Sequence, residues 1–337
     1  MGMKKHKWIY WIKLFAGLGL LYVVYSKINS RDSILAAFRA TGWRYIAWCA
    51  ALLLPNIALA FVKWRYLLKN RFSGIRNRQV FGSLLFGYTL GLVTPGRLGE
   101  LGRGLFFQDR DRVVITGLAV LDKLANQLII FTLGSLSLGA MILSRDLFQL
   151  SSRLPLLLIT ALLLLGAWSI MLNPGLVRRL LRRLQERYPQ MPRLASLASA
   201  FDNISFKDAL AVFALTLLWF LVIVLQYHVL VLALNRPAFG ESLQAVSAML
   251  FIKTLLPFTF GELGIREALA VYFYDPFGVS EAAVFNAAII VFLINFLLPA
   301  LAGIYYVFRV REVKKASRNA EAAVKPADPS GKAWQNF

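Results

Sequence analysis

Long apolar stretches follow one another along most of the chain. A helix needs about 20 apolar residues to cross the hydrocarbon core of a bilayer. Six stretches come close to this length or exceed it, and each predicts a spanning helix: 8–26, 43–62, 113–143, 154–172, 209–234 and 282–308. The pattern therefore predicts an all-α polytopic membrane protein.

Two further apolar stretches, 80–107 and 243–273, are interrupted near their middle by one repeated motif. Residues 95–102 read PGRLGELG, and residues 257–264 read PFTFGELG. Proline removes a backbone donor and glycine weakens a helix, so both stretches are expected to break at the motif. Each is then either a broken span or a hairpin that returns to its starting side.

The distribution of basic residues favours the hairpins. Lysine and arginine gather in 63–79 (from Lys63 onward), in 173–208, in the tail after 308 and at the start of the chain. Such segments are typical of the cytoplasmic side. Between the basic segments 63–79 and 173–208, the predicted helices 113–143 and 154–172 already cross the membrane twice. For the two basic segments to share one side, the stretch 80–107 must therefore enter and leave the membrane from that side. By the same count, 243–273 enters and leaves from outside, so both stretches are predicted to be re-entrant hairpins.

Helix, hairpin and helix therefore occur twice, over about 43–143 and 209–308, in opposite orientations. Inverted repeats with broken helices are the architecture of many secondary transporters. We expect one transmembrane domain over 1–312, with a basic cytoplasmic segment at 174–203, and a disordered cytoplasmic tail at 313–337. Residues 174–192 form a basic amphipathic pattern, which either lies among lipid headgroups or only fixes the topology.

Composition agrees with a membrane protein, because 58% of residues are hydrophobic and only 16% are charged. The net charge of +21 is explained by the basic loops, so no nucleic-acid partner is expected. The single cysteine, Cys49, excludes an internal disulfide. With His6 and His228 as the only histidines, no histidine-rich metal motif exists, and neither a P-loop nor a G-x-S-x-G motif occurs. We therefore expect no cofactor, no metal and no catalytic residue.

Ionisable residues within a membrane are costly and mark functional sites. Both hairpins carry such residues beside proline and glycine. Glycine lets a ligand approach the backbone closely, and the start of a half-helix suits a phosphate. Arginine and lysine add positive charge, and the glutamates hold the arginines or contact a cationic headgroup. The predicted substrate-binding residues are Pro95, Arg97, Gly99, Glu100, Arg103, Lys253, Pro257, Gly261, Glu262, Gly264, Arg266 and Glu267.

A purely structural interpretation stands beside this one. Glu100 with Arg103, and Glu262 with Arg266, are spaced so that each pair falls on one face of a helix. Each pair would then be an internal strut of its hairpin, with no ligand.

The two stretches TPGRLGELGRGLFF and LPFTFGELGIREALAVYFY resemble the signature of the lysylphosphatidylglycerol synthetase transmembrane-region family, also called flippase-like domain proteins. The resemblance covers about residues 8 to 312. Its most specific positions are Pro95, Gly99, Glu100, Arg103, Pro257, Gly261, Gly264 and Glu267. The resemblance implies a domain that moves lipid between leaflets. The cytosolic aminoacyltransferase domain of bifunctional members is not expected, because only a short tail follows the last helix.

The function that we expect is a lipid translocase of the bacterial plasma (inner) membrane, with both termini cytoplasmic. It would bind an anionic phospholipid or a polyprenyl-phosphate-linked lipid at the two hairpins. With no ATP site, movement would be downhill or coupled to an ion, and Glu100 or Glu262 would carry a proton. Two alternatives remain open: a membrane enzyme or enzyme subunit that modifies lipid headgroups, with Glu100 as a base, and a non-transporting scaffold. Two kinds of protein partner fit this function: a second copy of the chain, and enzymes of a lipid pathway.

Overall fold

The computed structural model of the protein describes residues 15, 17–26, 28, 31–144, 150–202, 204–256 and 264–324. Every regular element in these ranges is a helix, which confirms the expected all-α class. In chain order the elements are the apolar helix Gly17–Ser26, α2 (Arg31–Ala40), α3 (Gly42–Ala51), α4 (Leu53–Arg71), α5 (Asn77–Leu92), the 3-10 segment η1 (Pro95–Phe106), α6 (Arg112–Ser144), α7 (Leu150–Leu172), α8 (Pro174–Arg187), α9 (Pro192–Ser199), α10 (Phe206–Val231), α11 (Phe239–Leu255), α12 (Ile265–Tyr274), η3 (Asp275–Phe277), α13 (Glu281–Phe292), the π-helical turn η4 (Leu293–Leu297) and α14 (Leu298–Val324).

Within the described residues, four helices are long and apolar enough to cross a membrane. They are Gly42–Arg71, Arg112–Leu143, Phe206–Val231 and Glu281–Glu312. The first of these spans comprises α3 and α4. A fifth candidate joins Leu158–Ile170 to Gly175–Arg187 across a bend of 79°. Of the predicted span 8–26, only the later part is described, as the helix Gly17–Ser26. The helices are those of a multi-pass membrane protein, and the expected total of six spans stays a prediction.

Helix α5 and segment η1 form an antiparallel hairpin. Two glycines of α5 contact side chains of η1 in reverse order along the chain. A Cβ added at Gly87 would lie 2.7 Å from Cγ of Arg103, and one at Gly91 would lie 3.1 Å from Cγ of Glu100. The two ends of the hairpin also meet, because Nη1 of Arg110 donates to the carbonyl of Ser73 at 3.4 Å. The stretch 80–107 therefore breaks at the motif and returns to the end from which it starts, as the pattern predicted.

The second interrupted stretch is described only in part. Helices α11 and α12 pack against one another, and the motif residues between them, 257–263, lie outside the described residues.

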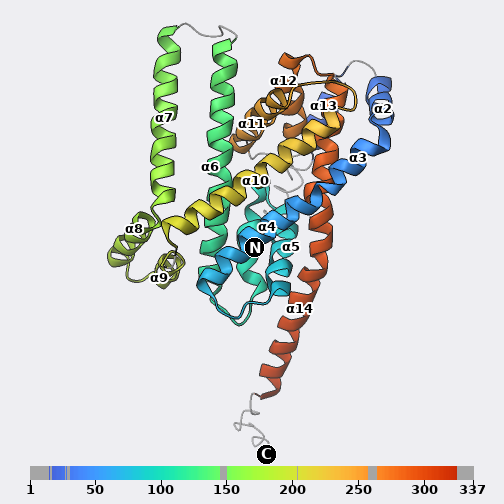
Figure 1. The fold of residues 1–337 in the computed structure, drawn as a ribbon. Helices are drawn as coiled ribbons and strands as arrows, with labels where there is room; N and C mark the ends of the chain where they lie inside the picture. The colour runs from blue at the N-terminus through green and yellow to red at the C-terminus, as the bar shows by residue number, and fades with distance from the viewer. Residues whose placement is uncertain are drawn as a thin grey trace, which may run out of the picture.

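The basic segments gather at one end of the bundle (Figure 1). The loop 72–76, helices α8 and α9, and the last turns of α14 all lie at that end. Helices α2 and α12 lie at the opposite end, together with the end of α6 and the start of α7. This grouping agrees with the sidedness inferred from the basic residues. Which end faces the cytoplasm stays a prediction.

One boundary was predicted wrongly. Lys63 was placed at the start of a basic loop, 63–79, but α4 continues to Arg71 and Lys63 is buried. The helix continues because Ala60, Trp64, Leu67 and Leu68 extend its apolar stripe at helical spacing, and all four are buried. The true loop is only 72–76, so Lys63 belongs to the interior of the bundle.

Helix α14 lies unusually close to α5. A Cβ added at Gly303 would lie 2.1 Å from the carbonyl oxygen of Leu85 and 2.2 Å from Oγ1 of Thr89. The same Thr89 hydroxyl donates to the carbonyl of Ala300 at 2.6 Å. Small residues and interhelical hydrogen bonds of this kind hold membrane helices together. The contact fixes the hairpin against the last helix.

We predict that Gly303→Ala lowers the midpoint of thermal unfolding in detergent. The added methyl group meets backbone that cannot move without separating α5 from α14, and overpacking of this kind costs about 1–3 kcal/mol. Gly166→Ala in α7 is the matched control, because a Cβ there meets nothing within 4 Å. Equal melting of the two variants would contradict the close packing of α5 and α14.

Candidate functional site

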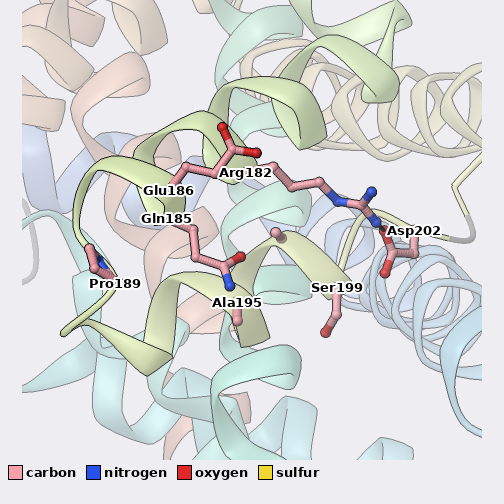
Figure 2. A pocket seen from close by; sticks show the side chains of 8 residues that line it. Arg182, Gln185, Glu186, Pro189, Ala195, Ser199 and Asp202 are labelled. Carbon is pink, nitrogen blue, oxygen red and sulfur yellow. Dashed lines mark hydrogen bonds and ion pairs between the residues drawn. The ribbon is translucent and has the colours of Figure 1, made fainter.

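Two hollows are prominent in the structure, and they differ in position and lining. The first, of about 530 Å³, lies at the surface between α8 and α9 (Figure 2). Its lining includes Arg182, which donates to Asp202 at 3.2 Å, and it contains none of the predicted site residues. The second, of about 640 Å³, lies inside the bundle, lined by α4, α5, η1, α6, α10, α11, α12, α13 and the π-helical turn η4. The interior cavity is therefore the candidate site.

The interior cavity is rich in positive charge. Among the described residues that line it, the basic ones are Lys63, Arg97, Arg103, Lys123, Lys253 and Arg266. The acidic ones in the same described set are Glu100 and Asp122. The remaining lining is largely aromatic and aliphatic, and it includes Trp219, Phe292 and Phe296.

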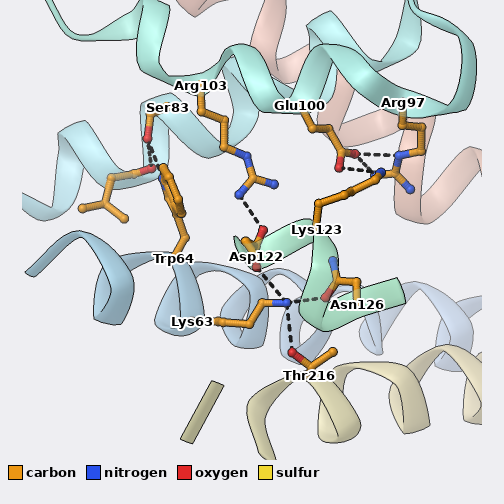
Figure 3. A network of polar contacts seen from close by, with 11 residues as sticks. Lys63, Trp64, Ser83, Arg97, Glu100, Arg103, Asp122, Lys123, Asn126 and Thr216 are labelled. Carbon is orange, nitrogen blue, oxygen red and sulfur yellow. Dashed lines mark hydrogen bonds and ion pairs between the residues drawn. The ribbon is translucent and has the colours of Figure 1, made fainter. Parts of the chain in front are cut away.

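Asp122 on α6 bridges two buried cations (Figure 3). Its carboxylate lies 2.9 Å from Nζ of Lys63 on α4 and 2.8 Å from Nη1 of Arg103 on η1. The three side chains are only 4–6% exposed. Lys63 also donates to Asn126 on α6 and to Thr216 on α10. This buried group, the Asp122 cluster, joins three helices and the hairpin at one point.

Aromatic packing holds Arg103 in this arrangement. The Arg103 guanidinium lies 5.0 Å from the ring centroid of Trp64, which is a cation–π contact. The indole N–H of Trp64 donates in turn to the hydroxyl of Ser83 on α5, at 2.8 Å. Both limbs of the hairpin are therefore tied to α4.

Glu100 also pairs with two cations, but these cations are more exposed than those of Asp122. The carboxylate accepts from Nε of Arg97 at 2.6 Å and lies 3.3 Å from Nζ of Lys123. Arg97 and Lys123 are 22% and 24% exposed, whereas Glu100 is 7% exposed. We call this group the Glu100 cluster. The two cations of this cluster are therefore more exposed than the carboxylate that they share.

Arg97 sits at the turn of the hairpin in a rare backbone conformation. Its φ of 57° makes it the one non-glycine residue with positive φ among the described residues. Such a conformation costs of order 1–3 kcal/mol and persists only where surrounding contacts enforce it. The guanidinium lies 4.2 Å from the ring centroid of Phe296 and 5.6 Å from that of Tyr88. These contacts hold the Arg97 guanidinium in one orientation, beside the Glu100 carboxylate.

The second hairpin contributes Lys253 from α11 and Arg266 from α12 to the same cavity. The Arg266 guanidinium lies 4.7 Å from the ring centroid of Phe292. Glu267 does not line the cavity: it is fully buried and accepts from the backbone N–H of Gly264 at 2.7 Å, which caps the start of α12. Gly264 has a φ of 82°, and a Cβ there would lie 2.7 Å from the carbonyl oxygen of Gly17.

The cavity therefore brings together Arg97, Glu100, Arg103, Lys253 and Arg266 of the predicted set. Gly99 and Gly264 approach other backbone instead: a Cβ at Gly99 would lie 2.1 Å from the carbonyl oxygen of Leu90. The Pro95 side chain and the residues Pro257, Gly261 and Glu262 lie outside what the structure describes.

The structure does not contain the expected strut between Glu100 and Arg103, because each of the two side chains pairs with other residues. Glu100 pairs with Arg97 and Lys123, and Arg103 pairs with Asp122. The pairing of Arg266 with Glu262 lies outside the described residues.

The cavity-lining members of the two clusters that were absent from the predicted set are Lys63, Asp122, Lys123 and Asn126. A signal for two of them exists in the sequence. Asp122 and Asn126 are four apart on one helix, so they share a face, and α6 spans 33 residues, more than a membrane requires. Within the described ranges, no three His, Cys, Asp or Glu side chains gather as a metal site requires.

A family model described as the lysylphosphatidylglycerol synthase TM region matches residues 10–303. No curated protein matches the sequence.

We predict that Asp122→Asn is far more destabilising than Lys63→Met. The first change leaves two buried cations without their carboxylate, and breaking a buried pair from one side costs about 3–5 kcal/mol. The second leaves Asp122 paired with Arg103, so the loss should be smaller. Thermal melts in detergent measure both, with the exposed Asp109→Asn as the neutral control. The reverse order of the two variants would show that Asp122 is not the residue that joins the elements.

Proposed function

Because the chain belongs to the lysylphosphatidylglycerol synthase transmembrane-region family, we propose that it is a lipid translocase whose interior cavity binds a phosphate-bearing lipid headgroup. One observation carries the proposal: of the cavity-lining cations that pair with Glu100 and Asp122, Arg97 and Lys123 are about a quarter exposed, whereas Lys63 and Arg103 are nearly buried. An arginine fork and a lysine beside it match the oxygens of a phosphate in charge and geometry.

The lining also suits the rest of an amphipathic ligand. Leu98 lines the cavity beside the hairpin turn and is 58% exposed, so it marks a mouth of the cavity. Apolar residues continue from there along α10 and α13, including Ile223 and Val291. A headgroup can bind among the charges while its acyl or prenyl chain stays beside apolar side chains. The shared chemistry of the ligand is a phosphate ester on a long apolar chain.

The arrangement of elements favours an alternating-access mechanism. Helix, hairpin and helix occur twice, as α3–α4, α5–η1 and α6, and again as α10, α11–α12 and α13–α14. The first hairpin begins at the end that holds α8 and α9, and the second begins at the opposite end (Figure 1). Both hairpins line the cavity. We take these units as inverted repeats of one transmembrane domain over 1–312, with the basic end cytoplasmic in a bacterial plasma membrane.

We predict that Arg97→Gln and Lys123→Gln each slow the translocation of an anionic lipid by about tenfold or more, because a charged hydrogen bond contributes about 1.5–3 kcal/mol. The assay uses proteoliposomes with fluorescent phosphatidylglycerol, phosphatidylcholine or polyprenyl phosphate, and the rate at which label becomes accessible to an impermeant quencher. The phosphatidylglycerol and polyprenyl phosphate arms distinguish the two sources of the phosphate.

The matched control is Arg179→Gln, which removes an exposed arginine of α8 that does not line the cavity. Movement of no lipid above the rate in empty liposomes would contradict the proposed function. Equal rates for the control and the cavity variants would show that lipid crosses elsewhere.

We also predict that each hairpin begins and ends on one side of the membrane. Cys49 is fully buried, so single cysteines introduced elsewhere can be labelled selectively. Cysteines at Ser73 and Asp109 should react with an impermeant thiol reagent from the cytoplasmic side, and those at Ala238 and Asp275 from the other. If the two members of either pair react from opposite sides, that segment crosses the membrane and the inverted repeat is wrong.

A further inference from the structure

We propose that Glu100 is a built-in competitor for the lipid phosphate: it occupies the anion site when the cavity is empty and takes up a proton when the phosphate displaces it. The inference rests on the proposed function, because it concerns the same cavity. It adds a linkage between lipid binding and proton uptake.

The first step concerns competition for the same donors. Glu100 presents its carboxylate to Nε of Arg97 at 2.6 Å and to Nζ of Lys123 at 3.3 Å. A phosphate oxygen accepts the same charge-assisted hydrogen bonds from the same groups. Because Arg97, Lys123 and Glu100 all line the cavity and the two cations are 22–24% exposed while Glu100 is 7% exposed, an incoming phosphate has better access to the cations than to the carboxylate. Phosphate and carboxylate therefore exclude each other.

The second step concerns the surroundings of the displaced carboxylate. The titratable and charged groups around it are Arg97 and Arg103 of η1, Lys123 and Asp122 of α6, Lys63 of α4, Tyr88 of α5, Lys253 of α11 and Arg266 of α12. Arg103 and Lys63 are already bound to Asp122, at 2.8 and 2.9 Å. A carboxylate that loses its cations while it stays buried becomes neutral by taking up a proton.

The charge then balances. The phosphodiester brings one negative charge to Arg97 and Lys123, and one proton from the bulk solution binds a carboxylate oxygen of Glu100. The net charge of the cavity is the same before and after the lipid binds.

Comparison with the Asp122 cluster shows why the exchange is assigned to Glu100. Both carboxylates bridge two cations, but the cations of Asp122 are 4–5% exposed and those of Glu100 are 22–24% exposed. Lys63 and Arg103 also line the cavity, but they are nearly buried, so a ligand reaches Arg97 and Lys123 more readily. Asp122 therefore stays in place during the exchange, and its cluster serves as the fixed frame.

The test measures proton uptake on binding by the full-length protein in detergent. The ligand is dihexanoyl phosphatidylglycerol below its micellar concentration, a phosphodiester that does not itself titrate near neutral pH. Calorimetric titrations at pH 7.5 in buffers of different ionisation enthalpy give the number of protons taken up per ligand. We expect a value close to one for the unmodified protein and close to zero for Glu100→Gln.

Affinity gives a second readout. Glu100→Gln removes the competitor, so we expect it to bind the ligand about tenfold more tightly than the unmodified protein at pH 8, which corresponds to about 1.4 kcal/mol. The difference should narrow as the pH falls, because a binding reaction that takes up a proton becomes stronger at lower pH in the unmodified protein but not in Glu100→Gln. Lys123→Gln should bind more weakly at both pH values and still take up a proton, and Glu100→Asp should retain the uptake.

Binding without proton uptake by the unmodified protein would overturn the inference and leave the proposed function standing. Weaker binding by a folded Glu100→Gln variant would also overturn it, because Glu100 would then support the ligand. If Glu100→Gln does not fold, the uptake measured for the unmodified and Glu100→Asp proteins decides the matter. A failure of the unmodified protein to bind the ligand at all counts against the inference, and the translocation assay separately decides the proposed function.

Discussion

The salt bridges of Asp122 with Lys63 and Arg103 are the interaction on which the rest of the site depends. A charge buried without a partner is expensive, and removing one member of a buried pair strongly destabilises the fold. Here a single carboxylate neutralises cations from α4 and η1, and Lys63 reaches α10 through Thr216. These contacts set where η1 lies against the bundle, and the position of η1 sets where Arg97 and Glu100 meet the cavity.

Two clusters of the same composition thus take different roles because of their exposure. In each, a carboxylate lies between two cations, and aromatic rings support an arginine: Trp64 beside Arg103, and Phe296 with Tyr88 beside Arg97. The closed cluster binds structural elements together, whereas we propose that the open one offers its cations to a ligand. The rare backbone conformation of Arg97 belongs with the open cluster, because strain of this kind gathers where a side chain must be held in one orientation.

Much of the fold could be predicted from local rules, since each helix needs only a long apolar run. The break within 80–107 followed from Pro95 and its neighbouring glycines, and the structure places the turn there. The boundary at Lys63 failed because counting basic residues ignores a lysine whose partner lies on another helix. The same limit applies to the charge pairs of the site. Spacing suggested that Glu100 and Arg103 pair, but spacing says nothing about Asp122, which comes beside them only when α6 packs against η1.

Photo-crosslinking with an anionic phospholipid that carries a diazirine in its headgroup tests the central claim most directly, namely that the headgroup binds among the charges of the interior cavity. The protein would be irradiated in proteoliposomes and the modified peptides identified by mass spectrometry. Crosslinks at the hairpin turn around Arg97 and Leu98, and on α6 between Lys123 and Gln127, are the predicted result. Crosslinks confined to exposed side chains of the bundle exterior, such as Leu162 and Leu163 of α7, would contradict it.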